Sequence, residues 1–289
     1  MDRFYFSAFA ILLTLTIQTP TAHAKRVLFA SQFSLIPVSQ AHQSFGVAQG
    51  GELDPKSIKV LAWNIKKGQE RGLEIDLPRL AGDRDLVLIS EGYLKPELKS
   101  LFESFQGYGW EFGVSFLYKK DHNYETGTMI GSKVSPSDVI VTHTVDLEPL
   151  IKTPKALTMA KYPVQGQDRL LLVISVHGIN MASHDAFVRH MDQAFYEIDQ
   201  HDGPVLFSGD FNTRTKKRIS HLFQETTKRG FQSVDFIDGD KRSKGLGGNF
   251  LDWSFVRGVH IKNPHIYSVK SSDHQPMHFE MALDSSTLH

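Results

Sequence analysis

Short runs of β-branched and aromatic residues, each bounded by Gly, Pro, Asp or Ser, dominate the sequence from residue 59 onward. Several runs are apolar at every position, as in strands that are buried on both faces of a sheet. Runs of this length and composition predict β-strands. The predicted strands span residues 59–63, 86–89, 112–118, 128–130, 139–144, 170–176, 204–208, 251–256 and 278–281.

Helical patterns are fewer. Apolar residues recur at spacings of three and four over residues 187–198, and Ser183 precedes them as a candidate N-cap. Further helices are predicted at about residues 215–229 and 96–105. Because strands crowd together between residues 112 and 176, the pattern disfavours a parallel sheet in which strands and helices alternate. It favours an α/β fold in which two mixed sheets pack together with helices outside.

Residues 1–24 have the features of an export signal. The apolar stretch from Phe6 to Ile17 is followed by Pro20, and Ala22 and Ala24 occupy the positions that a signal peptidase reads. An uncleaved membrane anchor is the alternative, but such a stretch is short of the roughly 20 residues that span a bilayer. We expect cleavage after residue 24 and export to the periplasm or out of the cell, with no transmembrane segment in the mature chain.

The rest of the chain divides into three parts. Residues 25–56 lack clear periodicity and hold a Gly-Gly pair and a proline, which predicts a loosely ordered N-terminal lead-in. Neither repeats nor a change of composition interrupts residues 57–283, so we predict one domain there. Residues 284–289 form the expected C-terminal tail.

The composition excludes several kinds of chemistry. Cysteine is absent, which rules out disulfides, thiolate nucleophiles and cysteine-ligated zinc or iron–sulfur clusters. Lys+Arg and Asp+Glu both number 32, so no net charge attracts nucleic acid or an anionic membrane. A bound metal must therefore have oxygen and imidazole ligands, and any preference for a polyanion must come from a local patch.

Polar side chains stand at the ends of several predicted strands. A buried strand that ends in a carboxylate or an imidazole carries that group to the rim of a sheet, where loops form clefts. We therefore expect these groups to converge. They are Asn64, Glu91, His177, Asp210, Asn212 and the pair Asp273-His274, which precedes the last strand.

Three of these residues are predicted metal ligands. Glu91 and Asp273, with help from Asn64, offer the oxygen ligands that suit a hard cation such as Mg²⁺ or Mn²⁺. Such a cation binds phosphate oxygens directly, which suits the hydrolysis of phosphoesters. Zinc would favour more imidazoles.

The other residues have predicted catalytic roles. Asp210 can accept a proton from an attacking water, and Asn212 can hold that water or a phosphoryl oxygen. His177 and His274 can donate to phosphoryl oxygens as charge builds there, and Asp252 is the candidate partner that fixes the tautomer of His274. Each residue taken singly also fits a structural role, such as a turn or a core histidine. Their joint order favours catalysis.

Seven segments, in this order along the chain, resemble the endonuclease/exonuclease/phosphatase superfamily. The likeness spans about residues 57–283 and is closest to a bacterial YafD-like branch. Its most specific signal is Gly-Asp-Phe-Asn at residues 209–212, followed by Ser-Asp-His-Gln-Pro at residues 272–276. The matching segments are residues 61–65, 86–91, 126–132, 173–177, 203–213, 251–255 and 272–276.

The resemblance implies a four-layered α/β sandwich, in which two mixed β-sheets are flanked by helices and the site lies at one rim. It also implies Mg²⁺ or Mn²⁺ as cofactor. Carried over residue by residue, it makes Glu91 the main metal ligand with Asn64 nearby, and Asp273 a further ligand or a structural acid. Asp210 becomes the base that activates water, and His177 contacts the phosphate.

The chain departs from the family pattern at three points. Ser90 stands where many members have Gln, and Lys66-Lys67 stand where some nucleases have an acid, which favours one metal ion over two. The acid that pairs with the first histidine in pancreatic-type deoxyribonucleases has no clear match here. Glu111 and Glu125 are the candidates for it, and neither is included in the predicted site.

The substrate is less constrained than the chemistry. Between residues 211 and 249, nine basic residues face four acidic ones, which fits either a nucleic-acid backbone or a solvated helix face and loop. An exported, metal-dependent phosphodiesterase, acting first on nucleic acid, is the leading hypothesis. The alternatives are a lipid or inositol phosphate phosphoesterase, with Tyr108, Trp110 and Trp253 as candidate membrane-facing aromatics, and a non-catalytic binding module. We expect a monomer.

Overall fold

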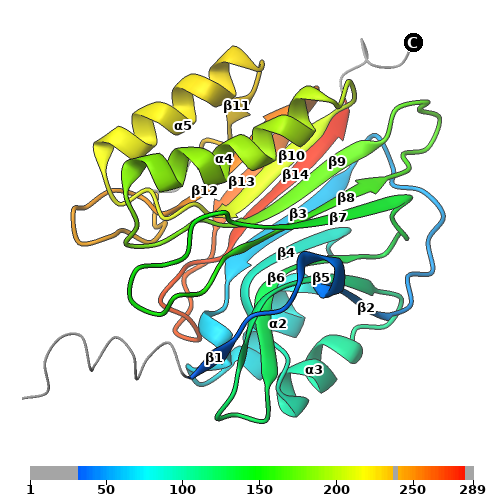
Figure 1. The fold of residues 1–289 in the computed structure, drawn as a ribbon. Helices are drawn as coiled ribbons and strands as arrows, with labels where there is room; N and C mark the ends of the chain where they lie inside the picture. The colour runs from blue at the N-terminus through cyan, green and yellow to red at the C-terminus, as the bar shows by residue number, and fades with distance from the viewer. Residues whose placement is uncertain (1–31, 237–239, 284–289) are drawn as a thin grey trace, which may run out of the picture.

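The computed structural model describes residues 32–236 and 240–283. The predicted signal peptide, the start of the lead-in and the C-terminal tail lie outside these residues. Two β-sheets pack face to face (Figure 1). The strands of the first sheet are β1 (Phe33–Ser34), β2 (His42–Gly46), β3 (Ile58–Asn64), β4 (Leu86–Tyr93), β5 (Gly109–Tyr118), β6 (Tyr124–Ser132), β13 (Val259–Ile266) and β14 (Met277–Leu283).

Both sheets are mixed. The first has the order β1-β5-β6-β4-β3-β14-β13, with β2 paired to β5, and the second has the order β11-β12-β10-β9-β8-β7. In each sheet one parallel pair, β3 with β4 or β9 with β10, stands among antiparallel neighbours. The strands of the second sheet are β7 (Asp138–His143), β8 (Ala156–Tyr162), β9 (Leu171–His177), β10 (Val205–Asp210), β11 (Gln232–Ser233) and β12 (Asp252–Arg257).

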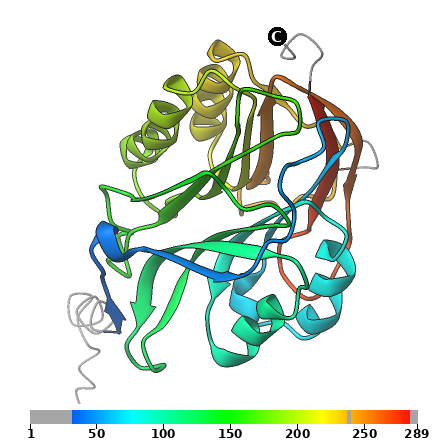
Figure 2. The same ribbon diagram turned by 90° about the vertical axis from the view of Figure 1, so that its right-hand side faces the viewer.

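Helices cover the outer face of each sheet, which gives the four predicted layers (Figure 2). The helices α2 (Leu73–Ala81) and α3 (Pro96–Glu103) pack on the first sheet, and α4 (His184–Asp199) and α5 (Lys216–Lys228) pack on the second. Short 3₁₀ turns, η1 (Val38–Gln40) and η2 (Lys66–Gly68), complete the list.

The alternation of side chains along β3 shows how one strand serves two cores. Val60 and Ala62 lie in the core between the sheets, together with Leu206 of β10. Leu61 and Trp63 point the other way and pack in the core beneath α2 and α3. Successive side chains of a strand point to opposite faces, so a run that is apolar throughout is buried on both sides. The predicted fold class is confirmed.

Every predicted strand overlaps an observed one, but the prediction missed several elements. The helix α2 contains Pro78 and starts after Gly72, whose φ is 95° and which provides no side-chain cap. Strand β13 is interrupted by a register shift between Lys262 and His265. Both features obscure the sequence pattern. The expected loose order of the lead-in is wrong for β2, whose backbone pairs with β5 from Gly46 to His42.

Ser183 caps α4 as predicted. Its Oγ accepts a hydrogen bond from the Ala186 amide at 3.1 Å. We expect Ser183→Ala to lower the free energy of unfolding by about 1 kcal/mol, because the Ala186 amide then has no protein acceptor. Urea denaturation measures the change. Ser220→Ala, on the exposed side of α5, is the control that should leave stability nearly unchanged.

His190 is a buried histidine that the fold holds neutral. Its Nδ1 accepts a hydrogen bond from the Ile179 amide at 3.1 Å, and its Nε2 has no partner among the described residues. Burial, with a smaller contribution from Lys155 and Arg218, lowers the pKa of His190 to about 3. Protonation at Nδ1 would break the hydrogen bond from the Ile179 amide, which also lowers the pKa of His190.

This burial makes stability depend on pH. Below the ordinary histidine pKa of about 6.5, the unfolded chain binds a proton at His190 that the folded chain does not. The free energy of unfolding should therefore fall as pH falls from about 6.5 towards 3, by up to about 1.4 kcal/mol per pH unit from this group. Chemical denaturation of wild type and His190→Gln between those pH values measures it. Equal slopes in the two proteins would contradict the prediction.

Candidate active site

The sheet registers bring the predicted strand ends into two rows, one in each sheet. Asp210, at the end of β10, is paired with His177 of the parallel strand β9 and with Asp252 of the antiparallel strand β12. In the first sheet, Asn64 at the end of β3 lies opposite Ser90 of β4, next to Glu91. The two rows face each other across the packed sheets, because Asn64 Nδ2 reaches Asp210 Oδ2 at 3.0 Å.

Gly209 lets β10 pass close to its neighbour just before Asp210. Its φ is 142°, and a Cβ atom there would lie 2.2 Å from the Val176 carbonyl oxygen. Residues with a side chain rarely adopt this backbone conformation, and no side chain fits in that space. Ser90 Oγ donates to the same carbonyl at 2.8 Å, which joins the two sheets beside the site. This is the contact made by the residue that replaces the family's usual Gln.

Asp210 is a buried carboxylate held by several donors. Its side chain is almost fully buried, and its Oδ1 accepts from the Asn212 amide nitrogen at 2.8 Å. Its Oδ2 accepts from Asn64 Nδ2 at 3.0 Å and from Asn212 Nδ2 at 3.3 Å. Burial raises the pKa of Asp210 to about 6, although the nearby His274 lowers it. A carboxylate with this pKa is suited to accept a proton near neutral pH.

Asp252 and His274 form a tight pair beside Asp210. His274 Nδ1 lies 2.9 and 2.8 Å from the two carboxylate oxygens of Asp252, so Nδ1 carries a proton and donates it. Its Nε2 points towards Asp210, 3.9 Å from Oδ2. Burial lowers the pKa of His274, but Asp252 and then Asp210 raise it to about 10. The ring is therefore a cation at neutral pH.

The loop that carries His274 is fastened to β3. Trp63 Nε1 donates to the His274 carbonyl at 2.9 Å, and Ser272 Oγ donates to the Asn64 carbonyl at 2.7 Å. These bonds fix the position of His274 relative to Asn64, although the two residues are far apart in the sequence.

Asn212 presents an unsatisfied oxygen. Its Nδ2 donates to the Gly178 carbonyl at 3.0 Å and to Asp210, which fixes the orientation of the amide. Its backbone φ of 51° is in the left-handed region, where Asn is better tolerated than most residues. The opposite atom, Oδ1, is buried and has no donor among the described residues. A buried acceptor of this kind fits a water, a substrate hydroxyl or a cation.

His177 is buried between two carboxylates. Its Nε2 lies 3.7 Å from both Glu91 Oε1 and Asp210 Oδ2. Burial, reinforced by Lys155, holds the pKa of His177 well below its usual value, so the ring is neutral. Neither candidate acid pairs with it: Glu111 Oε2 lies 2.6 Å from His42 Nε2, and Glu125 Oε1 accepts from Gln43 at 3.2 Å. The sequence alone did not point to Glu91 as one of the two carboxylates beside this histidine.

Glu91 is paired with a lysine that sequence reasoning did not include. Lys67 Nζ contacts Glu91 Oε2, and both residues have a positive φ. Burial opposes ionisation, but the charge of Lys67, with a smaller contribution from Lys155, holds the pKa of Glu91 well below its usual range. The signal for Lys67 is its position three residues after Asn64, in the Lys66-Lys67 pair that stands where some nucleases have an acid.

The structure brings most of the predicted residues together, but Asp273 lies apart from them. Asp210, Asp252 and His274 offer ligand atoms within 4.8 Å of one another, which makes them a possible metal site. Asn64, Asn212 and His177 surround Asp210. Glu91 lies on the far side of His177, 3.7 Å from its Nε2. Asp273 lies at the margin, because its side chain is 57% exposed and its Oδ2 is 3.4 Å from Lys66 Nζ. Its roles as a ligand or structural acid remain predictions.

A family model described as the endonuclease/exonuclease/phosphatase family matches residues 61–274, which include all of this cluster. The chain belongs to this family. It is 30% identical over 222 residues to a UPF0294 protein of Yersinia pseudotuberculosis, covering 76% of this chain and 82% of the relative. Such relatives belong to the YafD-like branch that the sequence resembles.

Solved structures give the same fold. An endonuclease/exonuclease/phosphatase family protein from Leptotrichia buccalis has a TM-score of 0.60 at 15% identity and covers 78% of this chain and 99% of its own. One from Beutenbergia cavernae has a TM-score of 0.61 at 16% identity and covers 79% and 72%, respectively. Among the described residues, no helix combines the length and apolar character that a membrane span requires.

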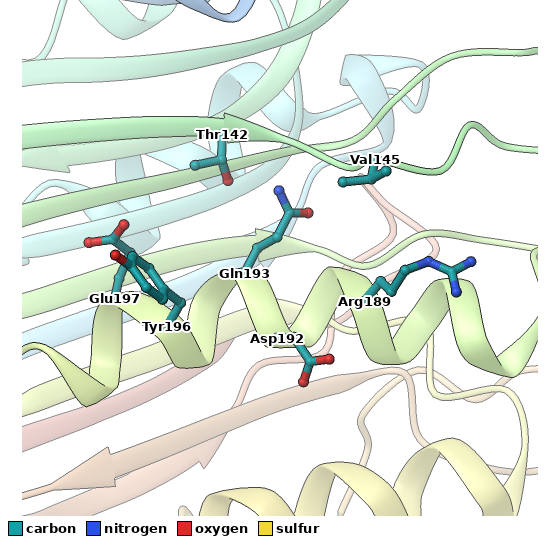
Figure 3. Close-up of a pocket in the computed structure, with 7 residues that line it drawn as sticks. All are labelled: Thr142, Val145, Arg189, Asp192, Gln193, Tyr196 and Glu197. Atoms are coloured by element: carbon teal, nitrogen blue, oxygen red, sulfur yellow. The ribbon is translucent and has the colours of Figure 1, made fainter.

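The donor set fits the divalent metal ion that is typical of this family. It consists of carboxylate and amide oxygens with imidazoles, and it includes the unsatisfied Asn212 Oδ1. A cavity of about 180 Å³ opens beside it, lined by Glu91, His177 and Asn180 among others. A larger cavity of about 400 Å³, between β7 and α4, is distant from this chemistry and holds Arg189, Asp192 and five other residues (Figure 3).

Proposed function

We propose that this member of the endonuclease/exonuclease/phosphatase family is an exported Mg²⁺- or Mn²⁺-dependent phosphodiesterase, and that its substrate is nucleic acid. The observation that carries the proposal is the buried Asp210, whose raised pKa suits a base and whose neighbours are the Asp252–His274 pair and the oriented Asn212. These are the groups that the hydrolysis of a phosphodiester by water requires.

Each residue has a defined part in this reaction. A water whose hydrogen is accepted by Asn212 Oδ1 would stand next to Asp210, which takes the second proton as the water oxygen bonds to phosphorus. The bond from phosphorus to the leaving oxygen breaks, and that oxygen takes a proton from solvent water. The cationic His274 donates from Nε2 to the phosphoryl group as negative charge builds there, while Asp252 holds the ring. The neutral His177 faces the same space and can donate to another phosphoryl oxygen.

The metal ion would be held by Glu91, with Asn64 and Asp273 as further oxygen donors. When bound, it neutralises the negative charge of the phosphate group. Lys67 contacts Glu91, so this lysine would share the carboxylate with the metal.

A lipid phosphoesterase is the second candidate. The aromatics that the sequence offered for membrane contact are buried, since Tyr108, Trp110 and Trp253 are 2%, 0% and 8% exposed. The candidate is favoured instead by Leu150 and Met181, which are 49% and 65% exposed and line a small cavity next to the site. Two aliphatic side chains offer less apolar surface than membrane-binding loops usually present.

An assay of the purified protein separates these functions. It is incubated with Mg²⁺, Mn²⁺ or EDTA and with plasmid DNA, RNA, sphingomyelin vesicles or inositol phosphates. We expect metal-dependent cleavage of DNA or RNA and none in EDTA. Cleavage of sphingomyelin alone would establish the second candidate, and no cleavage of any substrate would favour a binding module.

Export is tested separately. Expression of the full chain in a bacterial host, followed by fractionation and N-terminal sequencing, should give a periplasmic or secreted protein that begins at Lys25. An intact N-terminus in the membrane fraction would show an uncleaved anchor.

A further inference from the structure

A cavity of about 400 Å³ lies where α4 and α5 begin, beside the candidate active site. Its basic lining residues are Arg214, Lys217 and Arg218, with His184, and its lining contains no acid. We refer to it as the basic groove. The first residues of the two helices add to the positive potential, because the amides of a helix start carry partial positive charge.

The basic groove neighbours the site cavity through shared lining residues. Asn180 lines the cavity beside Glu91, and it also lines a small neighbouring hollow. Met181 lines that hollow and the basic groove, so three cavities follow one another along the loop before α4. Arg214 Nε donates to Asn180 Oδ1 at 2.6 Å, which ties the groove to the site cavity.

Arg218 gives the groove a fixed wall. It is buried, and its guanidinium donates to the carbonyls of Ile179, Asn212 and Ala182 at 2.9, 2.9 and 2.8 Å. These acceptors are neutral, so its charge is not cancelled. Arg218 therefore lines the groove and at the same time fixes the backbone of Asn212 in the loop after β10.

The basic groove differs in charge from the other cavities. In the site cavity, Lys67 and Lys155 are balanced by Glu91 and Glu148. The cavity between β7 and α4 is lined by one arginine and by two acids, Asp192 and Glu197 (Figure 3). Neither arrangement favours a polyanion, whereas the groove does.

The structure also divides the basic run that the sequence contains. Lys228 Nζ lies 2.6 Å from Glu225 Oε1, and Arg229 Nε lies 2.7 Å from Asp199 Oδ1, so these cations are neutralised at the far end of α5. At the near end, no ion pair joins Arg214, Lys217 or Arg218 to an acid among residues 32–236 and 240–283. Of the cations on α5, those without an ion pair among the described residues therefore lie at the start of the helix, which lines the groove.

We propose that the basic groove binds the phosphate backbone of a nucleic-acid strand next to the phosphate that is cleaved. The proposal rests on the proposed function and deepens it: the substrate is a polymer with several phosphates, and Lys217 and Arg214 contact a phosphate that is not cleaved. A lipid headgroup with a single phosphate has no second phosphate for this groove.

Binding, measured without turnover, tests the groove. A fluorescein-labelled 20-nucleotide single strand is titrated with the Asp210→Asn protein in Mg²⁺, and fluorescence anisotropy gives Kd at several salt concentrations. Adding Arg214→Ala and Lys217→Ala should raise Kd by about tenfold. The fall of the logarithm of the association constant with log salt should become less steep by about 1.4, or about 0.7 for each lost phosphate contact. Lys217→Arg should restore most of the loss due to Lys217→Ala.

The control is Lys228→Ala in the same background, because Lys228 is on the same helix but paired and remote from the groove. It should bind the strand like the parent, and circular dichroism and thermal melting should show that all variants are folded. An unchanged Kd and an unchanged salt dependence in the double variant would overturn the proposal that the groove binds the strand. The same proteins are also titrated with vesicles of anionic lipid in place of the strand, and a loss of binding seen only with the vesicles would overturn the proposal as well.

The outcomes distinguish this proposal from the proposed function. Loss of strand binding in the double variant, together with no cleavage of nucleic acid by the wild type, supports the groove and contradicts the catalytic function. Cleavage of nucleic acid by the wild type with unchanged binding in the double variant supports the function and contradicts the groove.

Discussion

Replacing Asp210 with Asn should reduce phosphodiester turnover by about 10²- to 10⁴-fold, the usual contribution of a general base. The amide has nearly the shape of the carboxylate but accepts no proton at neutral pH. It would also place an NH₂ group near the Nδ2 donors of Asn64 and Asn212, which now point at a carboxylate. The loss is measured by steady-state kinetics on the substrate that the wild-type protein cleaves in the assay with plasmid DNA, RNA, sphingomyelin and inositol phosphates.

The control for this variant is Asp192→Asn, which changes an exposed acid on α4 in the same way. It should keep the wild-type turnover. Far-ultraviolet circular dichroism and a melting curve show whether the Asp210→Asn protein is folded. A folded Asp210→Asn protein with full activity would remove Asp210 from the mechanism and leave the Asp252–His274 pair without its proposed partner.

Replacing Glu91 with Gln should weaken metal binding and reduce turnover by about 10²-fold or more, because a neutral amide replaces the main charged ligand. The variant also releases Lys67 from its ion pair, which leaves an ammonium near the phosphate. Because the defect is in metal affinity, raising the concentration of Mn²⁺ should restore part of the activity. Isothermal titration with Mn²⁺ should show a Kd raised by at least about tenfold.

Glu97→Gln, on the exposed side of α3, is the matched control and should bind Mn²⁺ like the wild type. Dialysis against EDTA should abolish the activity of the wild type, and Mg²⁺ or Mn²⁺ should restore it. An identical Mn²⁺ affinity in the Glu91→Gln protein would show that the ion is held elsewhere. The group of Asp210, Asp252 and His274 would then be the site to examine.

Local signals allowed much of the fold to be predicted. Apolar runs located β3, β4, β9 and β10, because a strand buried on both faces needs apolar residues at successive positions. Ser183 located the start of α4, because a side-chain cap is a local contact. The helix α2 gave no such signal, since Gly72 caps nothing and Pro78 interrupts the pattern; its packing on the first sheet maintains it.

The sequence by itself determined which polar residues end the buried strands and in what order, because strand ends follow from local patterns of apolar residues and turns. Only the tertiary structure decided how these residues are paired and charged. It placed Lys67 on Glu91, buried Asp210 until its pKa rose to about 6, and left Asn212 Oδ1 without a donor among the described residues. It also neutralised the far end of the basic run on α5 and left Lys217 unpaired among those residues. Burial and electrostatic interactions depend on segments that are distant in the sequence, so they are settled only when the two sheets pack together.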